Sequence, residues 1–219
     1  MKVHFLSGLG ADERVFRQLD LPGIEPRYIQ WIKPRRDEKL AAYAHRLLEQ
    51  IDTDRPVILV GVSFGGIMAQ EIAKLITCKK VIIISSIKSW REKPWQLHLV
   101  NFTKAHRLLP FRMVKSHRNW GNDYFFGTET KGESVFLKTI INETDEFFFK
   151  WAINQIVCWT PDHDHTDVFH IHGTEDRIFP YKPIQNCIPV EGAGHFMIVN
   201  RAKQVSHLIK QALQNSPSI

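Results

Sequence analysis

The sequence predicts a single α/β domain built on a mostly parallel sheet of about six strands, flanked by helices. Short β-branched runs of strand length alternate with segments of helical periodicity along the 219 residues. The composition, 43% hydrophobic and 24% charged, is typical of globular proteins and excludes disordered, collagen-like and coiled-coil chains. A chain of this length fits one domain, and it contains no internal repeat or obvious linker.

Five elements are predicted in the first third of the chain. Residues 2–7 form a short apolar strand that runs straight into glycines, and residues 27–32 alternate like a second strand. Residues 39–51 place apolar side chains at helical spacing. Residues 56–62 are a continuous apolar run, typical of a strand buried on both faces. Helical periodicity returns over residues 64–77.

The rest of the chain repeats this alternation after one interruption. Residues 80–85 are predicted as a buried strand, and residues 168–172 and 187–190 as the last two strands. Residues 198–213 are predicted as a C-terminal helix. The stretch at about 87–150 is aromatic, basic and irregular, with no clear buried strand. We interpret it as a helical lid inserted over one end of the sheet.

The strongest local signal is a GxSxG pattern centred on Ser63. Residues 61–66 spell Gly-Val-Ser-Phe-Gly-Gly, directly between a predicted buried strand and a predicted helix. This strand–turn–helix setting is the one in which the pattern presents a nucleophilic serine. The glycines are needed because the turn is tight and a Cβ would clash. The alternative is a glycine-rich turn with a passive serine.

A serine hydroxyl is a weak nucleophile at neutral pH and needs a base, which in turn needs an orienting acid. Asp176 follows a predicted strand, in the loop before Pro180. His195 follows the next predicted strand, directly after Gly-Ala-Gly, and is one of eleven histidines. Asp176 could instead cap a turn. The nearby acids that remain alternatives are Glu175, Asp162, Asp164 and Asp167.

The chain order of serine, aspartate and histidine resembles that of the α/β-hydrolase superfamily. The resemblance lies in the loop after the first strand and in the segments GVSFGG, HGTEDRIFP and GAGHF. It spans nearly the whole chain except the insertion. It implies that Ser63 is the nucleophile, His195 the base and Asp176 the acid of a serine hydrolase that needs neither a cofactor nor a metal.

The resemblance also implies an oxyanion hole made of two backbone N–H groups, those of Leu9 and Phe64. Two departures from the family pattern stand out. The family's loop usually begins His-Gly, whereas this chain has Ser7 and Gly8. The chain also starts at what would be the family's third strand, so we expect a minimal version lacking the first edge strands.

The net charge of +6 is concentrated in one segment. Residues 88–118 carry eight Lys and Arg against one acid, interleaved with aromatic side chains. Three interpretations remain open: a lid whose cations face water, a lid that draws in an anionic substrate such as a carboxylate or CoA thioester, and a nucleic-acid surface. We expect no nucleic-acid partner, because no recognised binding module accompanies the charge.

Other patterns are weaker. Gly8-Leu9-Gly10 hints at a dinucleotide fingerprint, but the third glycine would fall at Glu13. Residues 162–165, Asp-His-Asp-His, resemble metal ligands but more simply form a solvated turn. Three widely spaced cysteines and the absence of a long apolar run lead us to expect a cytoplasmic protein without stable membrane anchoring.

Together these features predict a hydrolase that cleaves a carboxylic ester or thioester of a small to medium substrate through an acyl-enzyme on Ser63. The pocket is expected between the insertion and the carboxyl ends of the strands. Two alternatives remain. The same three residues could serve a lyase or acyl transferase, or the protein could bind a ligand without turning it over.

Overall fold

The computed structural model describes residues 1–104, 120–161 and 168–214, and it confirms the predicted α/β fold class. Six parallel strands form one sheet in the order β2-β1-β3-β4-β5-β6. The strands are β1 (Lys2–Leu6), β2 (Glu25–Ile29), β3 (Val57–Val62), β4 (Cys78–Ile84), β5 (Val168–Gly173) and β6 (Ile188–Val190). From β1 the chain continues to β2 on one side, whereas β3 to β6 follow on the other side of β1. The topological switch point, where such sheets bind ligands, therefore lies between β1 and β3.

The sheet separates two hydrophobic cores. Because side chains alternate along a strand, neighbouring residues of β3 enter different cores, Leu59 on one face and Val60 on the other. Every residue of β3 is buried, as the continuous apolar run predicts for a strand covered on both faces.

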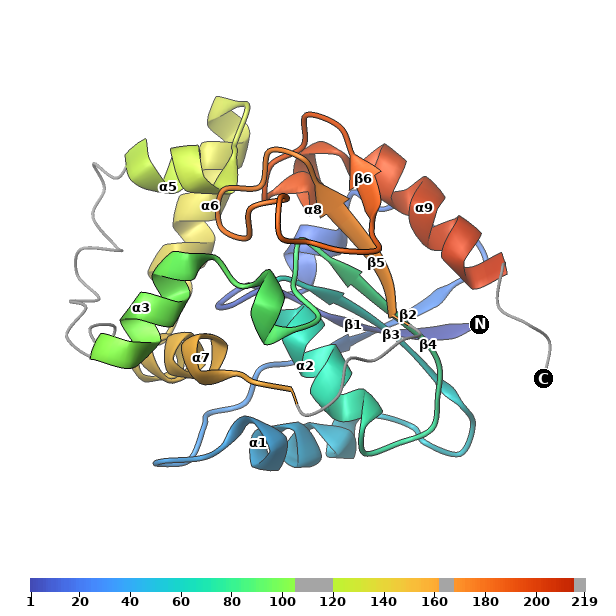
Figure 1. The fold of residues 1–219 in the computed structure, drawn as a ribbon. Helices are drawn as coiled ribbons and strands as arrows, with labels where there is room; N and C mark the ends of the chain where they lie inside the picture. The colour runs from blue at the N-terminus through green and yellow to red at the C-terminus, as the bar shows by residue number, and fades with distance from the viewer. Residues whose placement is uncertain (105–119, 162–167, 215–219) are drawn as a thin grey trace.

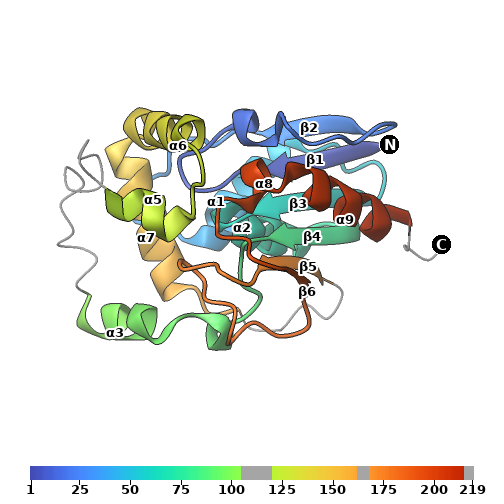
Figure 2. The same cartoon turned by 90° about the horizontal axis from the view of Figure 1, so that it is seen from above.

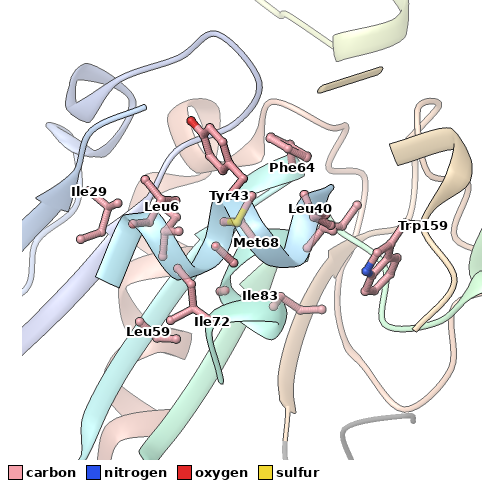
Figure 3. Close-up of a cluster of buried hydrophobic side chains, with 14 of the residues drawn as sticks. Leu6, Ile29, Leu40, Tyr43, Leu59, Phe64, Met68, Ile72, Ile83 and Trp159 are labelled. Atoms are coloured by element: carbon pink, nitrogen blue, oxygen red, sulfur yellow. The ribbon is translucent and has the colours of Figure 1, made fainter. Parts of the chain in front are cut away.

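Helices α1 (Leu40–Leu47) and α2 (Phe64–Ala73) cover one face of the sheet (Figure 1). Figure 3 shows Leu40 and Tyr43 of α1 in one cluster with Met68 and Ile72 of α2. The other face is covered by η1 (Glu13–Phe16), α8 (Met197–Asn200) and α9 (Ala202–Gln214).

The described parts of the chain between β4 and β5 contain helices joined by loops, and no strand. They are η3 (Trp90–Glu92), α3 (Trp95–Thr103), α5 (Trp120–Phe126), α6 (Lys131–Glu143) and α7 (Glu146–Cys158). Figure 2 shows α3, α5 and α6 beyond the carboxyl ends of the strands. The helices continue past residue 150, where the insertion was predicted to end: α7 carries Trp151 and Ala152 into the core beside α1 and α2.

Helix boundaries differ from the sequence predictions in three places. Helix α2 ends at Ala73, because Lys74 and Leu75 turn back onto Glu71 and Ile72 and the next strand begins at Cys78. The helix expected over 39–51 ends in a 3₁₀ turn, η2 (Leu48–Gln50). The predicted C-terminal helix is divided at Arg201 into α8 and α9. Of the helices in the described residues, none has the length and apolar character that crossing a bilayer requires.

Candidate active site

Ser63 lies on the sharp turn between β3 and α2. Its backbone has φ 54° and ψ −120°, a conformation that is strained for a residue with a side chain. Glycines make the turn possible. A Cβ on Gly65 would lie 2.3 Å from the carbonyl oxygens of Leu6 and Ser7, and a Cβ on Gly61 would lie 2.3 Å from that of Gly65.

Hydrogen bonds fix the backbone of Ser63 on both sides. Its N–H donates to Ile84 O at 2.9 Å, which ties the turn to β4. Its carbonyl accepts from the hydroxyl of Ser86 at 2.8 Å and from Gly66 N–H at 2.9 Å. The serine side chain is therefore presented above the sheet by a rigid frame.

His195 lies in the loop between β6 and α8, 132 residues from Ser63 in sequence, yet the two side chains meet. Its Nε2 is 2.9 Å from Ser63 Oγ, and its Nδ1 is 2.8 Å from Asp176 Oδ2. The imidazole is 4% exposed. Phe126 and Phe179 pack edge-on against it, with ring centroids at 5.5 and 5.7 Å. The ring is thereby held between the hydroxyl and the carboxylate.

Asp176 is the described carboxylate that reaches His195. It follows β5, and its second oxygen accepts the backbone N–H groups of Ile178 and Phe179 at 2.9 and 2.8 Å. Glu175 beside it is exposed. The remaining alternatives, Asp162, Asp164 and Asp167, lie outside the described residues, as does the Asp-His-Asp-His pattern.

The electrostatic surroundings keep Asp176 ionised. Burial by itself would raise the pKa of this carboxyl, but favourable electrostatic interactions with the His195 and His172 imidazoles and hydrogen bonds from His195 and the Phe179 N–H outweigh it. The pKa of Asp176 is therefore held below its ordinary value. An ionised Asp176 that accepts from Nδ1–H leaves His195 Nε2 free to accept the serine proton.

The two expected oxyanion donors both lie beside Ser63. Leu9 and Gly8 line the same cavity as Ser63 and His195. Phe64 is the first residue of α2, so its N–H has no acceptor within the helix and lies at the positive end of the helix dipole.

A cavity of about 300 Å³ opens above Ser63 and His195. Its polar side chains, besides those two residues, are Asn122 and Thr144. Within the described part of the chain, no charged side chain lines it. Its helical wall is formed mainly by Leu97, Phe126, Ile140, Phe149, Ile153 and Ile156.

Within the described residues, no Lys or Arg of the basic segment at 88–118 lines this cavity. Lys88 Nζ donates to the carbonyls of Gln185 and Asn186. Lys93 is buried and donates to the carbonyls of Val157 and Trp159, and burial lowers its pKa to about 8. The cations at 107, 112, 115 and 118 lie outside the described residues.

The cavity wall that α7 contributes was not predicted from the sequence. Phe149, Ile153 and Ile156 recur at helical spacing and face the cavity. The opposite side of α7, with Phe148 and Trp151, faces the core. With apolar residues on both sides, α7 shows no single apolar stripe, which explains why its helical pattern was not recognisable in the sequence.

The model of the alpha/beta hydrolase family matches residues 2–208. The chain belongs to the alpha/beta hydrolase family. The matched residues run from β1 into α9. The match confirms the resemblance to this family that the sequence predicted. Among curated proteins, no sequence matches it.

Solved structures share the fold at low sequence identity. A hydrolase from Oleispira antarctica superposes with a TM-score of 0.74 at 13% identity, covering 98% of this chain and 91% of that one. A thermophilic esterase from Thermogutta terrifontis gives 0.67 at 14% identity, covering 100% and 91%. The 2-hydroxy-6-oxo-6-phenylhexa-2,4-dienoate hydrolase of a Rhodococcus species gives 0.64 at 17%, covering 97% and 90%. Their different names show that this fold does not specify the substrate.

Proposed function

We propose that this alpha/beta hydrolase is a serine hydrolase that cleaves carboxylic esters, and secondarily thioesters, with a small to medium uncharged acyl group. The observation that carries the proposal is the unbroken chain from Ser63 Oγ through His195 to Asp176, located at the wall of an apolar cavity. A serine, a base and an orienting acid at hydrogen-bond distance are the arrangement that acyl transfer to serine requires.

The geometry supports a two-step reaction. His195 Nε2 takes the proton of Ser63 as the hydroxyl attacks the acyl carbonyl, and the oxyanion accepts from the N–H groups of Leu9 and Phe64. The intermediate collapses to an acyl-serine, and His195 returns the proton to the departing alcohol or thiol. Water then attacks the acyl-serine with His195 again as base, releasing the acid and restoring Ser63.

The lining and volume of the cavity support a small, neutral substrate. Its volume of about 300 Å³ lies at the lower end of the range for small-molecule sites. Burying a charged acyl group against its apolar wall would cost several kcal/mol without a partner. The described wall therefore favours a neutral acyl chain over the anionic substrate that the basic segment suggested.

A panel of p-nitrophenyl esters of graded acyl length, with matched acyl thioesters and a hemisuccinate ester, tests the proposal. We expect highest kcat/KM for a short to medium neutral acyl chain and at least about tenfold less for the hemisuccinate. Ser63→Ala should remove all turnover. Absence of turnover by folded wild-type protein, or a preference for the charged ester, would contradict the proposal.

A further inference from the structure

We infer that Trp31 is a positioning residue of the oxyanion hole: it holds the loop of Leu9 by hydrogen bonds and packs on the side chain of Phe64, without touching the substrate. The inference rests on the proposed function, because it takes the N–H groups of Leu9 and Phe64 as the oxyanion donors. It concerns a residue just after β2, outside every motif that the sequence analysis identified.

The indole N–H of Trp31 is shared between two acceptors on the loop after β1. It lies 3.0 Å from Ser7 Oγ and 3.1 Å from Gly8 O. Ser7 is buried, and its hydroxyl donates in turn to Ala11 O at 2.7 Å. Gly8 O also accepts Ala11 N–H at 3.0 Å. In place of the family's usual histidine, Ser7 and Trp31 thus close the loop around Leu9.

The direction of the Leu9 N–H follows from these bonds. Gly8 C=O and Leu9 N–H belong to one planar trans peptide, so they point to opposite sides. Two donors, Ala11 N–H and the Trp31 indole, hold the carbonyl on one side. The Leu9 N–H is thereby directed to the other side, and Leu9 lies on the cavity wall beside Ser63.

The ring of Trp31 also contacts the residue that supplies the second donor. Its centroid lies 5.3 Å from the ring of Phe64, which is fully buried at the start of α2. Phe148 of α7 packs on both rings, at 5.6 Å from Trp31 and 6.5 Å from Phe64. One side chain therefore links the loop of Leu9 to the helix start at Phe64.

Trp31 is itself held in place. The hydroxyl of Tyr43 donates to Ile32 O at 2.7 Å and accepts Ile32 N–H at 3.0 Å, which fixes the residue next to Trp31. The position of the indole is therefore set by the core rather than by a bound substrate.

Trp31→Phe tests the inference, because it removes the N–H and keeps an aromatic ring. Trp151→Phe is the matched control. Trp151 belongs to the same aromatic cluster, 6.0 Å from Phe64, but its indole N–H donates to Glu38 O at 2.8 Å, away from the loop. For both variants we would measure the melting temperature, kcat and KM on the best ester, and inhibition by a trifluoromethyl ketone of the same acyl length.

Trp31→Phe should lower kcat roughly 10- to 100-fold with KM within about twofold, since one oxyanion donor is misdirected rather than lost. Affinity for the ketone, whose hemiketal oxyanion mimics the transition state, should fall by a similar factor. Trp151→Phe should lower the melting temperature comparably while keeping kcat within about twofold. Ser7→Ala should repeat the kcat loss more weakly and serves if Trp31→Phe does not fold.

Unchanged kcat and ketone affinity in Trp31→Phe and Ser7→Ala would overturn the inference. Equal losses in Trp31→Phe and Trp151→Phe that follow the melting temperature would also overturn it, since they would indicate a structural role alone. Wild-type turnover separates these results from a failure of the proposed function, because an inactive wild-type protein contradicts that proposal instead.

Discussion

The imidazole rings of His170 and His172 are joined by a hydrogen bond of 3.1 Å, both fully buried on β5 behind Asp176. His172 Nε2–H donates to Phe179 O at 2.8 Å, so its Nδ1 accepts from His170 Nε2–H. This pattern needs a neutral His172 ring, and burial favours the neutral form of His170 as well. His172 Nε2 also lies 3.7 Å from Asp176 Oδ2, so the two histidines help to hold the Asp176 carboxylate in place.

These histidines should make the protein sensitive to mild acid. Burial lowers the pKa of both rings below 6.5, the value expected once the chain unfolds. Their contribution to stability is therefore complete above about pH 6.5 and is lost as the pH falls towards the folded pKa values. The slope should approach about 1.4 kcal/mol per pH unit for each histidine that titrates.

Urea unfolding between pH 7.5 and 5 measures this slope. His170→Phe should reduce it, whereas the exposed control His45→Gln should leave it unchanged. A free energy of unfolding that stays constant from pH 7.5 to 5.5 would show that the buried pair does not take up protons on unfolding.

Asp176→Asn should lower kcat by about 10³–10⁴-fold while the protein remains folded. An amide cannot hold His195 with its proton on Nδ1 as a carboxylate does, so Nε2 is no longer free to accept the serine proton. The exposed neighbour Glu175 supplies the control, and Glu175→Gln should keep kcat within about twofold. Steady-state kinetics on one ester measures kcat for both variants. Comparable losses of kcat in the two variants would contradict the assignment of Asp176 as the acid that orients His195.

Gly65→Ala should destabilise the fold by about 1–3 kcal/mol, because the added methyl would lie 2.3 Å from the carbonyls of Leu6 and Ser7. A Cβ on Gly132, in the first turn of α6, would come no nearer than 3.9 Å, to Thr130 Oγ1. Gly132→Ala should therefore stabilise the protein by about 0.4–1 kcal/mol. Thermal unfolding measures both shifts. A neutral Gly65→Ala would mean that the turn does not need this close approach.

Ile153→Trp should shift the preferred acyl chain towards shorter lengths, because a larger side chain on the wall reduces the cavity volume. The control on the same helix is Phe147→Trp, which changes an exposed ring. The dependence of kcat/KM on acyl chain length measures the shift. Identical profiles for wild type and Ile153→Trp would show that the acyl group does not bind against Ile153.

Local patterns predicted the sheet and the residues above it. The buried runs 56–62 and 80–85 are central strands because a sheet covered on both faces demands continuous apolar sequence. The turn at Ser63 was recognisable because Gly61 and Gly65 flank it, and a Cβ at either position would lie 2.3 Å from a backbone oxygen. His195 and Asp176 followed from their places just after strands.

Features that depend on contacts between distant side chains were not predictable from the sequence. Trp31 reaches the loop of Ser7 across 24 residues, and neither residue belongs to a pattern that announces the contact. The basic segment suggested an anionic substrate, yet Lys93 is used to hold the end of α7. Charge along a sequence does not indicate which cations will be buried or directed away from a pocket.

Intact-mass spectrometry after treatment with a fluorophosphonate probe, on wild type and on Ser63→Ala, tests directly whether Ser63 is an activated nucleophile. We expect a single adduct on the wild-type protein, mapped to Ser63 by peptide digestion and absent from the folded variant. An adduct that persists in Ser63→Ala, or no adduct on folded wild-type protein, would contradict the role of Ser63 as the activated nucleophile.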